Sequence, residues 1–138
     1  MPHSAKTRVL IVDDSPVDRK VVKAKLAKLG LKDVQEAENG TIAENKLRTG
    51  AEIGQPFDLV IADWHMPGGS GLNLLRHLRA DAKTKKTRVI MMTATAERET
   101  VQEAIASGVD AFIVKPVEIE ILIEKLASLG FQVTPKDE

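Results

Sequence analysis

Apolar and polar positions alternate in blocks along the chain. Short runs rich in Val, Ile, Leu, Met and Ala are separated by longer stretches in which apolar residues recur about every third or fourth position; the runs occupy residues 8–12, 34–37, 59–62, 88–92 and 111–114. Short apolar runs bounded by polar residues and glycines are typical of buried parallel strands. Polar side chains interrupt the run at 34–37, which is the weakest. The pattern predicts five strands.

The stretches between the runs predict helices. Ser15-Pro16 supplies a capping residue and a proline suited to a first helical turn, and the helix that follows should end before Gly30. Further helices are expected at residues 41–48, 71–80, 96–107 and 118–129. In the helix at 96–107, the side chains expected to face inward are Val101, Ala104 and Ile105.

Polar and glycine-containing segments predict the connections. Asn39-Gly40 is expected to form a turn, and residues 49–56 and 81–88 are expected to be exposed loops. Residues 131–138 predict a loosely held tail.

Strands and helices that alternate in this way imply parallel strands joined by right-handed crossovers, with helices on both faces of the sheet. The expected fold class is therefore α/β, with a doubly wound five-stranded parallel sheet. A chain of 138 residues is expected to form one domain, here residues 1–138 with a core at about 7–130.

Composition narrows the classes of function. Hydrophobic residues make up 43% of the chain and aromatic residues 3%, so the core must be aliphatic. Acidic and basic residues balance to a formal charge of +0, which argues against a dedicated nucleic-acid or anionic-membrane binder. No cysteine, no signal-like start and no apolar run long enough to span a bilayer is present, so we expect a cytoplasmic protein.

Polar residues follow four of the five strand runs directly. Because parallel strands point their carboxyl ends the same way, these residues should converge at one edge of the sheet, where open α/β sheets bind ligands: Asp13, Asp14, Asp63, Thr93 and Lys115. The strand at 34–37 lacks such a residue, as expected of an edge strand remote from the site.

The residue types in this set suit phosphoryl transfer. Carboxylates packed together repel one another unless a cation neutralises them, and oxygen ligands favour Mg²⁺. A lysine and a threonine hydroxyl nearby could donate hydrogen bonds to phosphoryl oxygens. Asp63 is central and is the natural acceptor, although an Asp in this position could also simply cap the following turn.

The same residues resemble a known family. Asp13-Asp14, Asp63 with Met66-Pro67, Thr93-Ala94 and Lys115-Pro116 together resemble the receiver domain of two-component response regulators over roughly residues 7–130. The resemblance is greatest to single-domain, CheY-like chemotaxis regulators, because Trp64 follows the acceptor and no output domain follows Leu129. It implies a flavodoxin-like sheet of strand order 2-1-3-4-5, for which CheY is itself a known example.

The resemblance also implies a role for each site residue. Asp63 would be the phosphoacceptor, Asp14 and Asp63 would bind Mg²⁺ directly, and Asp13 would act through water. The backbone carbonyl of His65 would be a further metal ligand, while Thr93 and Lys115 would contact the phosphoryl group. Phe112 occupies the aromatic switch position, with ordinary core packing as the open alternative.

Some residues near the site have no settled role. His65 and Thr95 are expected to tune the lifetime of the phosphorylated state, and Thr95 stands where many chemotaxis regulators have a carboxylate. The chain has no tyrosine, and its loop at 49–56 looks long. The glycines at 68–71 are expected to form a turn, since no phosphate-binding loop pattern is present. The Lys115-Pro116 peptide bond is expected to be cis.

The implied function is a phosphorylation-activated switch that receives its phosphoryl group from a histidine kinase or phosphotransfer domain. It would signal through the face formed by residues 96–107, 111–114 and 118–129 to a protein target such as the flagellar motor switch. A monomer or a weak phosphorylation-dependent dimer is expected. The alternative is a Mg²⁺-dependent phosphohydrolase with an aspartyl-phosphate intermediate. Haloacid dehalogenase-type enzymes usually carry a second Asp two residues after the nucleophile, where this chain has His65.

Overall fold

Strands and helices alternate throughout the parts of the chain that the computed structural model describes, residues 7–66, 71–94 and 97–133. The strands are β1 Arg8–Val12, β2 Asp33–Ala37, β3 Leu59–Asp63, β4 Arg88–Thr93 and β5 Ala111–Val114. The helices are α1 Pro16–Lys28, α2 Gly40–Glu52, α3 Gly71–Ala80, α4 Arg98–Ala106 and α5 Ile119–Ser128. The strands are parallel and lie in one sheet of order β2-β1-β3-β4-β5. The predicted fold class and strand order are confirmed.

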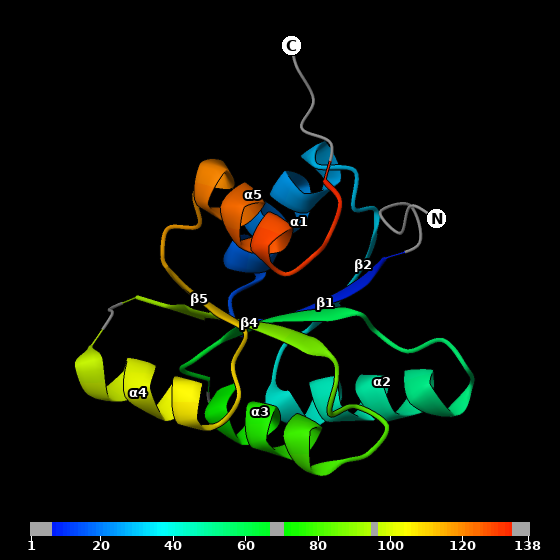
Figure 1. Ribbon diagram of the computed structural model, residues 1–138. Helices are drawn as coiled ribbons and strands as arrows, with labels where there is room; N and C mark the ends of the chain where they lie inside the picture. The colour runs from blue at the N-terminus through cyan, green and yellow to red at the C-terminus, as the bar shows by residue number, and fades with distance from the viewer. Residues whose placement is uncertain (1–6, 67–70, 95–96, 134–138) are drawn as a thin grey trace.

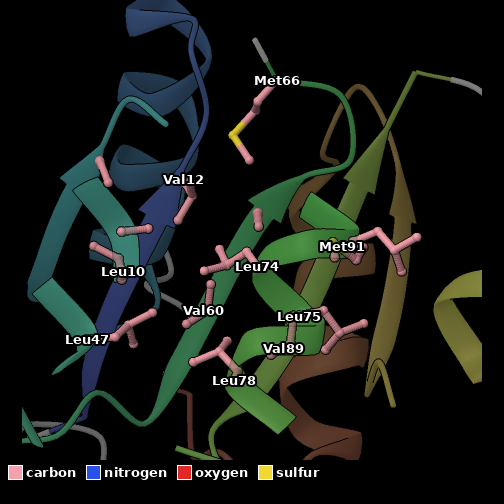
Figure 2. Close-up of a cluster of buried hydrophobic side chains, with 14 of the residues drawn as sticks. Leu10, Val12, Leu47, Val60, Met66, Leu74, Leu75, Leu78, Val89 and Met91 are labelled. Carbon is pink, nitrogen blue, oxygen red and sulfur yellow. The ribbon is translucent and has the colours of Figure 1, made fainter. Parts of the chain in front are cut away.

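Helices cover both faces of the sheet: α1 and α5 lie on one face, and α2, α3 and α4 on the other (Figure 1). Successive residues of a strand point to opposite faces. Leu10 and Met91 therefore join the buried cluster beneath α2, α3 and α4 (Figure 2), whereas Ile11 and Met92 join the cluster beneath α1 and α5. Burial on both faces explains why the central strands read as unbroken apolar runs.

Side-chain caps set the starts of α1 and α2. Ser15 Oγ accepts a hydrogen bond from the backbone N–H of Asp18 at 3.2 Å, and Asn39 Oδ1 accepts one from Ile42 at 2.8 Å. Such caps satisfy N–H groups that the first helical turn leaves without a partner. The expected turn at Asn39-Gly40 is therefore wrong, because Asn39 caps α2 and Gly40 is its first residue.

Helix α2 is longer than its sequence pattern predicted. The helix expected at 41–48 continues to Glu52, so the loop expected at 49–56 is shorter. Its buried positions include the small residues Ala43 and Gly50. A Cβ on Gly50 would lie 2.7 Å from the Gln55 carbonyl oxygen, so this end of the helix is packed closely without large side chains. Small contact residues explain why the apolar pattern understated the helix.

Helix α4 presents a narrower buried stripe than expected. Its bounds, Arg98–Ala106, fall inside the predicted 96–107, and residues 95–96 lie outside the described ranges. Ala104 is fully buried and Val101 is half-buried, but the side chain of Ile105 is 65% exposed. The expected inward position of Ile105 is wrong, because α4 lies at the end of its helical layer, next to α3, and meets the core mainly through Ala104 (Figure 1).

Two segments, one expected to be an exposed loop and the other a loosely held tail, pack against the rest of the fold in part. In the connection at 81–88, Thr84 is buried and its hydroxyl donates to the Leu78 carbonyl at 2.9 Å, and Arg88 already belongs to β4. After α5, Phe131 packs against the core, and its N–H donates to the Leu126 carbonyl at 3.0 Å. The expected loose tail at 131–138 is wrong for its first residues, and residues 134–138 lie outside the described ranges.

Candidate functional site

The carboxyl edge of the sheet brings the predicted site residues together. Asp13 and Asp14 follow β1, Asp63 ends β3, Thr93 ends β4 and Lys115 follows β5. Carboxylate oxygens of Asp13, Asp14 and Asp63 lie within 4.8 Å of one another. Asp13 and Asp63 are buried, whereas Asp14 is exposed. The result is an acidic pocket with one open side.

Lys115 links the acidic side chains to one another. Its Nζ donates to Asp18 Oδ2 at 2.9 Å, to Asp13 Oδ2 at 3.0 Å and to Asp63 Oδ2 at 3.3 Å. The Lys115-Pro116 peptide bond is cis, which confirms that prediction. The lysine therefore contacts the central carboxylate from β5, two strands away in the sheet.

Asp18 is the one charged partner of Lys115 that sequence reasoning missed. It lies in the first turn of α1, three residues after the capping Ser15. A signal was present: a helix that begins directly after Asp13-Asp14 must place its first turn at the same edge of the sheet. The capping pattern at Ser15-Pro16 therefore carried the information, because it fixes where that first turn starts.

Backbone N–H groups orient the two buried carboxylates. Asp13 Oδ1 accepts from the N–H of Ser15 at 2.9 Å, and Asp63 Oδ1 accepts from the N–H of His65 at 3.2 Å. In each case the other oxygen, Oδ2, faces Lys115. Both carboxylates are thus held from two sides, and their orientation is set before any ligand binds.

Burial raises the pKa of the Asp63 carboxyl above its ordinary value of 3.8, and the negative charge of Asp13 adds to that rise. The positive charge of Lys115 and the N–H of His65 oppose the rise but do not cancel it. Two carboxylates in one buried pocket disfavour each other's charged form. A further cation at this pocket would relieve that repulsion.

Lys115 responds to the same acidic surroundings. Burial by itself lowers the pKa of its ammonium group, but hydrogen bonds to Asp18 and Asp13 and the charge of Asp63 outweigh burial. The pKa of Lys115 therefore lies above its ordinary value of 10.5, and the side chain is a permanent cation. It can donate to a bound anion but cannot act as a base.

Trp64 and Phe112 lie next to the site on the side of α2, α3 and α4. Their ring centroids are 6.3 Å apart with the planes tilted by 46°. Trp64 is buried, and Phe112 is half-buried against the same core cluster. Thr93, on the strand between them, is fully buried. Phe112 is therefore packed as a core residue here, and its role as a switch stays a prediction.

Other predicted residues are placed less centrally. His65 is exposed. In the described part of the chain, the group of side chains that could hold a cation consists of Asp13, Asp14 and Asp63, and the imidazole of His65 does not belong to it. Pro67, the glycines at 68–69 and Thr95 lie outside the described ranges. The lifetime-tuning roles of His65 and Thr95 stay predictions.

Comparison with known proteins gives a match over most of the chain. Residues 9–127 match the model of the response regulator receiver domain. The chain belongs to this family. Chemotaxis protein CheY-3 of Vibrio cholerae is 44% identical over 119 residues, which cover 86% of this chain and 88% of that protein. Chemotaxis protein CheY of Pseudomonas aeruginosa is 39% identical over 122 residues, covering 88% and 94%.

Solved structures of other family members share the fold. A high-resolution structure of Vibrio cholerae CheY4 aligns with a TM-score of 0.79 at 30% identity, covering 88% of this chain and 97% of that one. The receiver domain of the Arabidopsis thaliana histidine kinase CKI1, in complex with Mg²⁺ and BeF₃⁻, aligns with a TM-score of 0.78 at 29% identity, covering 90% and 92%.

Family membership assigns the general function. The chain is a phosphoacceptor switch and not a catalytic enzyme, so the phosphohydrolase alternative is not supported. A receiver domain implies a histidine kinase as its partner. The acidic group is consistent with a divalent-metal site of the kind that receiver domains carry. No helix among the described residues has the length and apolar character needed to span a membrane.

Proposed function

We propose that this receiver domain is a chemotaxis-type, stand-alone regulator in which Asp63 accepts a phosphoryl group with the help of Mg²⁺. One observation carries the proposal: Asp63 Oδ2 lies 3.3 Å from the Lys115 ammonium, and its carboxylate adjoins those of Asp13 and Asp14. The relatives named chemotaxis proteins support the pathway. The match at residues 9–127 supports a single functional core at about 7–130.

The acidic group suits a hard divalent cation. Its donors are carboxylate oxygens, with neither thiolate nor imidazole among them. Asp14, Asp63 and the backbone carbonyl of His65 would hold Mg²⁺ directly, and Asp13 would do so through water. When bound, the ion would neutralise charge on the carboxylates and on the incoming phosphoryl oxygens. The CKI1 receiver domain, solved with Mg²⁺ and BeF₃⁻, supports this assignment.

The reaction is a phosphoryl transfer from phosphohistidine to a carboxylate. An Asp63 oxygen forms a bond to phosphorus, the P–N bond of the phosphohistidine breaks, and its electron pair stays on the imidazole nitrogen. Lys115 donates to a phosphoryl oxygen, and the Thr93 hydroxyl donates to another. The product is an acyl phosphate, which water hydrolyses; His65 and Thr95 would influence that rate.

We assign the output to the face formed by α4, β5 and α5. Each of these elements exposes one large apolar side chain: Ile105, Val114 and Ile121 are 65%, 43% and 39% exposed. Thr93 and Phe112 lie on the strands that border this face, so a change at the phosphoryl site can bias its packing. The unphosphorylated protein would already sample the active packing.

The proposal also covers the partners of the switch, its compartment and its oligomeric state. A flagellar motor switch protein is the proposed output partner, and a histidine kinase or phosphotransfer domain is the proposed donor. The absence of cysteine from the sequence suits the reducing cytoplasm. The regulator would act as a monomer or as a weak dimer that forms on phosphorylation.

The chemistry is tested with acetyl phosphate and Mg²⁺. Mass spectrometry should show one added phosphoryl group in the parent protein and none in Asp63→Asn. Asp58→Asn is the matched control, because Asp58 stands just before the same strand, at its other end, and is exposed. Stoichiometric modification that persists in Asp63→Asn would show that the acceptor lies elsewhere.

The output assignment is tested by amide NMR with beryllofluoride as the phosphoryl mimic. Beyond the residues at the site itself, the shift changes should cluster on α4, β5 and α5. Changes concentrated on α1 instead would show that this output assignment is wrong.

A further inference from the structure

A groove of about 530 Å³ opens at the amino edge of the sheet, which is the edge opposite Asp63. Segments far apart in the sequence form it: the residues just before β1, β3 and β4, and the chain just after α5. Its lining includes Phe57, Asp58, Lys83, Lys86, Leu129 and Phe131. None of these residues belongs to the phosphorylation site.

One wall of the groove is basic, because Lys83, Lys86 and Arg88 line it. Lys83, Lys85, Lys86 and Arg88 follow one another within residues 83–88, in a protein whose formal charge is +0. The three lysines are exposed and form no ion pair with any residue that the structure describes. The charge of the three lysines is therefore not neutralised by neighbouring side chains, whereas Arg88 pairs with Asp110 at 3.3 Å.

The acidic residues around the groove already have partners. Asp58 Oδ2 accepts the backbone N–H of Arg8 at 2.8 Å. Asp110 binds Arg79 at 2.7 Å and Arg88 at 3.3 Å. The cations that remain available to a ligand are therefore the lysines.

The basic wall extends past the groove itself. Lys86 and Arg88 also line a neighbouring hollow of about 310 Å³, together with Lys85 and Arg79. The cationic surface thus continues from one hollow to the next, over more of the surface than a single small anion would cover. An extended acidic segment fits this layout better.

The rest of the groove is apolar. Leu129 and Phe131 are half-buried, so each leaves part of an apolar side chain for a ligand to contact. Phe57 is 4% exposed and lies beneath the guanidinium of Arg8, 4.3 Å from its ring centroid. This ring is not open to stacking by a nucleobase, which disfavours a single-stranded nucleic acid. An apolar floor beside a lysine rim instead complements an acidic peptide with an aromatic or aliphatic anchor.

We propose that this groove is a docking site for an acidic protein segment that carries an apolar anchor, and that docking there is independent of phosphorylation. The anchor contacts Leu129 and Phe131, while carboxylates of the segment face Lys83, Lys85 and Lys86. Asp63 stays accessible, because the groove opens at the other edge of the sheet. Such a site holds the regulator near a partner complex in both signalling states.

The test uses the full chain and a fluorescein-labelled peptide in which a phenylalanine and a leucine are flanked by glutamates. Fluorescence anisotropy should show binding that weakens as salt rises, since exposed charges are screened. Lys83→Glu/Lys86→Glu should lower the affinity by about tenfold or more, because two favourable charge pairs become repulsive. Peptides with glutamine for glutamate, or with alanine for both apolar residues, should bind more weakly.

The charge-matched control is Lys20→Glu/Arg48→Glu, which changes two exposed cations outside the groove by the same amount. This control should bind the peptide as the parent protein does. Circular dichroism and acetyl phosphate labelling of Asp63 should be normal in both double variants. Loss of docking with normal labelling separates this site from the proposed phosphorylation chemistry, and Asp63→Asn should still bind the peptide.

Peptide-induced amide NMR shifts should centre on Thr87, Gly130 and Phe131, with equal affinity in the presence and absence of beryllofluoride. The proposal is overturned if the two double variants lose affinity for the peptide equally, or if the peptide-induced NMR shifts centre on α4, β5 and α5. A dependence on beryllofluoride, or tighter binding of an oligonucleotide than of the peptide, also overturns it. Concentration-dependent self-association through the groove, or peptide binding only after deletion of residues 134–138, would assign the groove to another occupant.

Discussion

Gly71 lies where helix α3 meets the proposed phosphoacceptor, and replacing it by alanine tests how closely the site is packed. Gly71 is the first residue of α3, and its N–H donates to the Trp64 carbonyl at 3.0 Å. A Cβ at this position would lie 2.4 Å from the backbone carbonyl oxygen of Asp63 and 3.1 Å from Met91 Sδ. Met91 can move, but the Asp63 oxygen belongs to the backbone of a central strand.

The magnitude follows from that distance. Ordinary contact begins at 3.4 Å, so the helix and the strand must separate by about 1 Å. Overpacking of this kind costs about 1–3 kcal/mol, and the better helix propensity of alanine offsets at most about 1 kcal/mol. We expect Gly71→Ala to lower the free energy of unfolding by about 1–2 kcal/mol, with a Tm about 4–8 °C lower.

The same displacement should reach the chemistry, because the clashing oxygen belongs to Asp63 itself. A misplacement of about 1 Å can slow a positioned reaction by a factor of ten or more. We therefore expect labelling of Gly71→Ala by acetyl phosphate to be slower by about tenfold. Urea unfolding and time-resolved mass spectrometry measure the two effects separately.

Gly40→Ala is the matched control. Gly40 is likewise the first residue of a helix, α2, and a Cβ there would meet nothing within 4 Å. It should leave labelling unchanged and should stabilise the protein by about 0.4–1 kcal/mol, through the lower entropy of the unfolded chain. If Gly71→Ala unfolds at the same urea concentration as the parent and is labelled at the same rate, the close-packing argument is refuted.

Three further predictions test the scaffold and the metal site. Arg79→Met should lower the free energy of unfolding by about 2–4 kcal/mol in urea titrations, because the guanidinium donates to three backbone carbonyls and to Asp110; a loss below about 0.5 kcal/mol would contradict this. The pKa of Glu36 is lowered from its ordinary value of 4.5, chiefly by its hydrogen bond with Arg19. The ionised side chain therefore stabilises the fold at pH values above 4.5, and this stabilisation is lost as the pH falls through the lowered pKa of the folded state. Glu36→Gln should therefore cost less than about 1 kcal/mol at neutral pH and nothing in strong acid, and an equal loss at both would exclude the ionic explanation. Asp14→Ala should weaken Mg²⁺ binding, followed by Trp64 fluorescence, while the fold stays intact, because Asp14 is exposed; unchanged affinity would remove it from the metal site.

The buried strands and the parallel sheet could be predicted from the sequence, because both depend on local periodicity. The central strands are buried on both faces, so they appear as unbroken apolar runs, and their alternation with helices implies a parallel sheet. A parallel sheet in turn places every strand's carboxyl end at one edge. That rule places Asp13, Asp63, Thr93 and Lys115 at the same edge, where the structure has them.

The apolar pattern gave wrong predictions for the extent of α2 and for the burial of Ile105. Helix α2 was predicted too short because Gly50 is its buried residue beyond Leu47, and a glycine adds nothing to an apolar periodicity. Ile105 fits the helical spacing of α4 but is exposed, because only the stripe around Ala104 reaches the core. Whether an apolar residue is buried depends on the neighbouring element as well as on its own helix.

The sequence by itself determined the fold class, which follows from the alternation of strands and helices, and the edge at which the acidic residues meet, which follows from strand direction. Only the tertiary structure decided which side chains touch across that edge. Asp18 binds Lys115 from 97 residues away, and Gly71 packs on the Asp63 carbonyl. The same holds for the basic groove, whose lining combines Phe57, Lys83 and Phe131. Such contacts depend on crossover geometry and on the lateral order of strands and helices, which bring distant segments within a few ångströms and leave no period along the chain.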